Sequence, residues 1–137
     1  PYTTLFRSIG SHPHVVQPME LRRGKEGVTD RLVVYSLGNF ISNMSREHTD
    51  GGVMVKVVLG RKELRRYIVS AQYSLIYSSR YKNEQGKEDI RVVPAASWLG
   101  KNQNSSFSVD SALIKYVNNT RLFLKGNNKE VEEYIFE

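Results

Sequence analysis

Apolar and polar residues alternate over two long stretches in the middle of the chain, residues 53–59 and 67–77. In both stretches every second side chain is apolar, which is typical of a strand that buries one face. A polar, glycine-containing segment at residues 60–66 separates them. The pattern therefore predicts a long antiparallel hairpin. Its tyrosine stripe could bind a sugar or a polymer, but core packing with the hydroxyl groups at the rim is the favoured interpretation.

Shorter extended segments precede this hairpin. Residues 15–21 have an extended pattern, and the basic, glycine-flanked residues 22–27 are typical of a hairpin turn. Residues 32–37 are almost all apolar, which favours a strand in the middle of a sheet. After the long hairpin, residues 80–87 form a polar loop, and a short strand at residues 90–93 ends at a proline.

Near the C-terminus the period of the pattern changes from two to about 3.6 residues. The apolar positions are Val109, Leu113, Tyr116, Val117, Thr120 and Phe123. This spacing predicts an amphipathic helix with Ser108 as its N-cap and Gly126 just beyond its end. We expect a second short helix at residues 129–134, and a polar linker at residues 101–106.

The composition fits one globular domain. The 137 residues are 39% hydrophobic and 25% charged, and no apolar run approaches the 18 or so residues of a membrane span. Cysteine is absent from the sequence, which excludes disulfides and thiolate metal sites. The formal net charge is +6, but the basic residues are dispersed in turns without interleaved aromatic side chains. We therefore expect no nucleic-acid partner.

The candidate chemistry begins at Gly10-Ser11-His12-Pro13-His14. Neutral imidazole is a common ligand of divalent metals. Pro13 disfavours the helical conformation at His12, so we expect extended backbone with both rings on one side and Cα atoms roughly 6.5 Å apart. His12 and His14 could then share one metal ion or hold one each of a pair. The alternative is a pair of surface histidines in a turn.

A second segment, Tyr35-Ser36-Leu37-Gly38-Asn39-Phe40, ends the predicted central strand. Together with the Gly-x-His-x-His loop it resembles the CapA family, the bacterial poly-γ-glutamate capsule synthesis proteins. That family resembles in turn a branch of the metallophosphoesterase superfamily. Gly38 and Asn39 favour a turn. We expect Asn39 to lie near the histidine loop and to bind a ligand or phosphate, or alternatively to satisfy its own backbone.

The resemblance implies an α/β fold, namely the C-terminal portion of a metallophosphoesterase-like α-β-β-α sandwich, rich in antiparallel strands and with a C-terminal helix. It also implies two divalent ions (Mn, Fe or Zn) with His12 and His14 as ligands and Gly10 and Asn39 beside them. The implied function is the synthesis or export of a capsule polymer. The substrate would be a phosphoester or an anionic polymer. Other capsule-synthesis membrane proteins would be partners in the bacterial cell envelope, with membrane anchoring through an N-terminal segment. The alternative is a non-catalytic envelope component that binds or guides the polymer.

Residues 1–8 resemble the translation of a sequencing-library adapter, and we expect few core contacts from them. The expected domain is residues 9–137, the C-terminal part of a longer family domain whose upstream half would supply the remaining metal ligands. Such a fragment is expected to be inactive alone. His48 and Asp50 could also join a metal site, but they lie in a segment that we expect to be a solvated loop.

Overall fold

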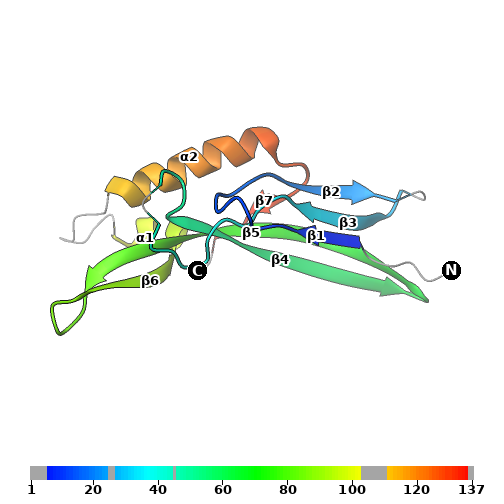
Figure 1. Ribbon diagram of the computed structural model, residues 1–137. Helices are drawn as coiled ribbons and strands as arrows, with labels where there is room; N and C mark the ends of the chain where they lie inside the picture. The colour runs from blue at the N-terminus through cyan, green and yellow to red at the C-terminus, as the bar shows by residue number, and fades with distance from the viewer. Residues whose placement is uncertain (1–5, 25–26, 45, 103–110, 136–137) are drawn as a thin grey trace.

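The computed structural model describes residues 6–24, 27–44, 46–102 and 111–135, and within them the fold is mixed α/β with strands predominating (Figure 1). The first sheet has the order β1-β3-β2 and the second the order β4-β5-β6, with β7 also paired to β5. The strands are β1 (Phe6–Ile9), β2 (Met19–Arg23), β3 (Thr29–Val34), β4 (Gly51–Lys62), β5 (Arg65–Lys82), β6 (Glu88–Pro94) and β7 (Glu132–Glu133), and the helices are α1 (Ala95–Asn102) and α2 (Ser111–Asn127).

The predicted long hairpin is confirmed as β4 and β5, which pair from Gly51–Tyr77 to Lys62–Arg65. A bulge interrupts this ladder, because Val58 pairs with Ser70 whereas Leu59 pairs with Ile68. An extra residue on one strand reverses which side chains face the core. Ile68 is consequently buried and Val69 is 58% exposed, so the predicted apolar stripe is wrong at Val69.

β3 lies at the centre of the first sheet, as its apolar sequence predicts. It pairs in parallel with β1 and antiparallel with β2, and Leu32 and Val34 are buried. The predicted turn after β2 is also present, since the Gly24 amide donates to the Val28 carbonyl at 2.8 Å. β3 ends at Val34, three residues before the predicted end. Beyond it the regular ladder gives way to isolated bridges, from Leu37 to Val16 and from Gly38 to Gly52 of β4.

The first residues of the chain that the structure describes belong to β1. Residues 6–9 pair with Arg31, Leu32, Val33 and Val34 of β3, so the main chain of residues 6–8 contributes a ladder that the sequence analysis did not expect. β1 is an edge strand of its sheet, and Ile9 is 56% exposed. Leu5 lies outside the described residues.

The helix α2 buries four of the side chains that the 3.6-residue period predicts, namely Leu113, Tyr116, Val117 and Thr120. The prediction is wrong at Phe123, which is 44% exposed, and the neighbouring Leu124 is buried instead. In Figure 1 this helix and the β1-β3-β2 sheet lie over the same side of the β4-β5 hairpin, and residues of all three parts share one core cluster. None of the helices in the described ranges has the length and apolarity needed to cross a membrane.

Two predictions near the C-terminus are wrong, and part of a third lies outside the described residues. Gly126 lies within α2, which continues to Asn127, so it is not the residue beyond the helix end. Residues 132 and 133 form β7 rather than a second helix, because their main chain pairs in parallel with β5. The helix α1, which follows Pro94, was not predicted. Ser108 and Val109 lie outside the described residues.

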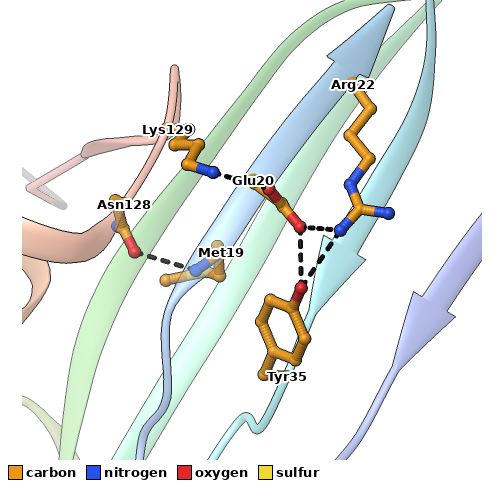
Figure 2. Close-up of polar contacts among 6 residues, drawn as sticks. All are labelled: Met19, Glu20, Arg22, Tyr35, Asn128 and Lys129. Atoms are coloured by element: carbon orange, nitrogen blue, oxygen red, sulfur yellow. Dashed lines mark hydrogen bonds and ion pairs between the residues drawn. The ribbon is translucent and has the colours of Figure 1, made fainter. Parts of the chain in front are cut away.

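A buried carboxylate ties the C-terminal segment to β2 (Figure 2). Glu20 is 7% exposed and accepts hydrogen bonds from Arg22, from the Tyr35 hydroxyl at 2.8 Å and from the Lys129 ammonium at 3.4 Å. These donors, Arg22 first, lower the pKa of Glu20 from 4.5 to about 2. The Asn128 Oδ1 accepts from the Met19 amide at 2.9 Å, so main chain and side chains join the same two segments.

Glu20→Gln is expected to lower stability by about 1–2 kcal/mol at neutral pH, since bonds to an ionised group are lost. Because the folded pKa is depressed, the contribution of Glu20 is fully present above about pH 4.5 and disappears as the pH falls toward about 2. Thermal unfolding of both proteins between these pH values checks this, and their Tm difference should shrink at acid pH. Glu130→Gln, which alters an exposed pair with Arg23 at 3.3 Å, should show no such pH-dependent difference.

Candidate functional site

The histidine loop, residues 10–17, connects β1 to β2 and is held by main-chain bonds to the segment that follows β3. The Gly10 amide donates to the Val34 carbonyl at 2.9 Å, and the Gly10 carbonyl accepts from the Leu37 amide at 2.8 Å. At the other end, the Gln17 amide donates to the Ser36 carbonyl at 3.0 Å. The two sequence segments that carry the family resemblance are therefore hydrogen-bonded neighbours.

Gly10 occupies a position that permits no side chain. A Cβ atom there would lie 2.4 Å from the Tyr35 carbonyl oxygen, which is closer than real Cβ contacts come. The role that the structure gives Gly10 is the close approach of two main chains, which brings the histidine loop onto the segment after β3. This is a structural reason for the glycine before the two histidines.

The prediction of extended backbone through the histidines is wrong. The His14 amide donates to the Ser11 carbonyl at 3.1 Å, so residues 11–14 form a turn. His14 adopts the left-handed conformation with φ 61°, a region that histidine visits more often than most residues. Pro13 has no amide to donate, and the turn closes across it instead. Both His12 and His14 are exposed on this turn.

Asn39 meets His14, although the two residues are 25 positions apart. The distance between the His14 Nδ1 and the Asn39 Oδ1 is 2.9 Å. The side-chain nitrogen of Asn39, Nδ2, donates to the Thr49 carbonyl at 2.9 Å and lies 3.7 Å from the Met44 sulfur. Asn39 therefore lies beside the histidine loop, as expected, and its side chain contacts His14 rather than its own backbone.

The loop at residues 46–50 is exposed at residues 46–48 and is closed by hydrogen bonds from Thr49. Thr49 is 3% exposed, and its amide and hydroxyl both donate to the Arg46 carbonyl, at 3.2 and 2.6 Å. The sequence did not predict that Thr49 would contact Asn39, because Thr49 accepts through its main-chain carbonyl, a group that every residue has. His48 is exposed with φ 66°, and its Nε2 lies 3.8 Å from a Glu47 carboxylate oxygen.

A cavity of about 530 Å³ separates the histidine loop from α2. α2 lines it with two polar and two apolar residues, and His48 from the loop at residues 46–50 also lines it. The lining residues are Val15, Val16, Gln17, His48, Asn119, Thr120, Leu122 and Phe123. Val15, which directly follows His14 in the chain, lines this cavity, whereas His12 and His14 do not.

The donor set for a metal ion is incomplete in the described part of the chain. The described residues contain no group of three or more His, Asp or Glu side chains that could hold a metal together. A catalytic zinc site takes three protein ligands and a structural site four. The described residues thus offer two imidazoles on one turn, with an amide partner beside one of them.

Residues 8–44 match the family model described as bacterial capsule synthesis protein PGA_cap. The match contains both the histidine loop and the segment with Asn39, and it points to bacterial capsule synthesis for this part of the chain. Residues 45–137 lie outside it. Comparison with curated proteins and with solved structures found no match.

Proposed function

We propose that this chain is a CapA-type capsule synthesis protein whose histidine loop forms one side of a metal-dependent, phosphoesterase-like site. The observation that carries the proposal is the 2.9 Å contact between His14 and Asn39. It joins the two segments inside residues 8–44, where the chain matches the capsule-synthesis family. The tightly held main chain around Gly10 adds support, because a ligand-bearing turn needs a rigid base.

In this proposal His12 and His14 are metal ligands, and the remaining ligands come from outside the described residues. The metals would be two divalent ions, Mn, Fe or Zn, which when bound activate a water molecule and neutralise an anionic oxygen. The chain's own contribution is to place two imidazoles on one turn and to fix one of them through Asn39. The substrate would be a phosphoester or an anionic capsule polymer such as poly-γ-glutamate.

The second candidate is a non-catalytic component that binds or guides an anionic polymer. The specific observation in its favour is the tip of the β4-β5 hairpin, where Arg61, Lys62, Arg65 and Arg66 are all exposed. These four cations could attract a polyanion without any metal. In both cases the proposed location is the bacterial cell envelope, with other capsule-synthesis membrane proteins as partners.

The two candidates are separated by loading the purified chain with Mn²⁺ or Zn²⁺ and measuring bound metal, phosphodiester hydrolysis and binding to poly-γ-glutamate. Bound metal with turnover above that of the free ion supports the catalytic proposal. Polymer binding that persists in full when the metal is removed favours the guiding role. If neither metal binds at concentrations that occupy ordinary two-histidine sites, the proposal of a metal site in this chain is wrong.

A further inference from the structure

The Asn39 side-chain amide makes two hydrogen bonds that determine which way it faces. Its nitrogen donates to the Thr49 carbonyl at 2.9 Å, while its oxygen lies 2.9 Å from the His14 Nδ1. With the amide turned over, its oxygen would face the Thr49 carbonyl oxygen, and two acceptors would oppose each other. The main chain of the loop at residues 46–50 therefore sets the atom that Asn39 presents to His14.

An amide oxygen can only accept a hydrogen bond, so the His14 Nδ1 must carry the proton. In a neutral imidazole the other nitrogen, Nε2, then holds the free electron pair. We propose that Asn39 is a positioning residue that selects the Nδ1–H tautomer of His14 and thereby presents Nε2 to a divalent metal. That Nε2 then binds a metal rests on the proposed function, whereas the choice of tautomer does not. Metal-binding histidines commonly donate their second nitrogen to such a partner.

The main chain holds both partners of this contact in place. Gly38 has φ 72°, and a Cβ atom there would lie 2.8 Å from the Gly51 carbonyl oxygen. The backbone N–H of the next residue, Asn39, donates to the same Gly51 carbonyl at 3.0 Å. His14 reaches Asn39 from a left-handed backbone conformation, which is unfavourable for a non-glycine residue unless its surroundings impose it. The contact is thus built from β4 on one side and the turn at residues 11–14 on the other.

The tautomer can be measured directly by ¹⁵N NMR of the histidine rings in the metal-free chain. We expect the wild-type His14 to show the Nδ1–H form. Asn39→Ala should give a mixture of both tautomers, because it removes the acceptor oxygen that faces the His14 Nδ1. Asn43→Ala is the matched control, since Asn43 lies nearby but accepts from Arg80 at 2.6 Å. It should leave the His14 signals unchanged.

A predominantly Nε2–H ring in the wild type would overturn the proposal, and this measurement needs no variant to fold. An unchanged tautomer in a folded Asn39→Ala variant would overturn it as well. Zn²⁺ titration adds the second readout, with an expected loss of about 10–100-fold in affinity for Asn39→Ala and no loss for Asn43→Ala. If the wild type binds no Zn²⁺ but shows the expected tautomers, the proposed function fails while the positioning role stands.

Discussion

His14→Ala is expected to lower the Zn²⁺ or Mn²⁺ affinity of the chain by more than the roughly 10–100-fold that follows the loss of an outer partner, because a ligand itself is removed. His12→Ala should act in the same direction, since the two rings occupy the same exposed turn. In the proposed site this chain supplies two imidazoles, so either substitution would leave one. Metal content after desalting, measured by mass spectrometry, checks the result. Any metal-dependent hydrolysis should fall together with it.

His48→Ala is the matched control for these variants. Like the other two it is an exposed histidine, but it belongs to a different loop, where its Nε2 lies 3.8 Å from Glu47. We expect its metal content to equal that of the wild type. Unchanged metal content in both the His12 and His14 variants would contradict the ligand assignment, and a loss confined to His48→Ala would move the site to the other loop.

Gly52→Ala is expected to be strongly destabilising and to displace the candidate site. A Cβ atom at this position would lie 2.6 Å from the carbonyl oxygens of both Leu37 and Asn39, which are main-chain atoms that cannot move aside as a flexible side chain does. Overpacking of this kind amounts to about 1–3 kcal/mol, equivalent to a fall in Tm of roughly 5–10 °C. Because Asn39 must shift, the His14 ring signals should change in the same variant.

Gly126→Ala is the same substitution as Gly52→Ala but is expected to raise the Tm rather than lower it. A Cβ atom at Gly126 would have nothing within 4 Å, and the residue lies inside α2. Alanine favours a helix over glycine by up to about 1 kcal/mol, so the Tm should rise slightly. A fall in Tm would instead indicate the left-handed helix end that the sequence predicts at this glycine. The two glycines thus test the structure in opposite directions by thermal unfolding.

The sequence predicts those elements whose pattern is local. The β4-β5 hairpin, the central position of β3 and the buried face of α2 all follow from periodicity, because each buries one face against a single core. The bulge at Val69 does not follow, since an extra residue leaves the apolar pattern almost unchanged while it reverses the strand faces. β7 was missed for another reason: its two residues form a strand only because β5 offers an unpaired edge beside them.

In the candidate site, too, some features were predicted from the sequence and others were not. The motifs correctly indicated that His14 and Asn39 would lie close together, because the two segments were read as parts of one family pattern. The turn at residues 11–14 was not predicted, since it depends on a main-chain bond across Pro13. The Thr49 carbonyl, which orients Asn39, leaves no signal in a sequence at all. The residue types thus indicated that His14 and Asn39 belong to the site, whereas their orientation depends on contacts in the folded chain.

The attachment of the C-terminal segment to β2 has a consequence for the order of folding. The bond between Met19 and Asn128 spans 109 residues, and Lys129 also pairs with Glu20. Contacts of such long sequence separation slow folding, because the chain must close a large loop before it gains them. During synthesis the outer edge of β2 stays open until residue 129 has emerged, and an open edge can pair with other chains. The sheet that bears the histidine loop is therefore completed late, at the stage when the nascent protein is most exposed to misassembly.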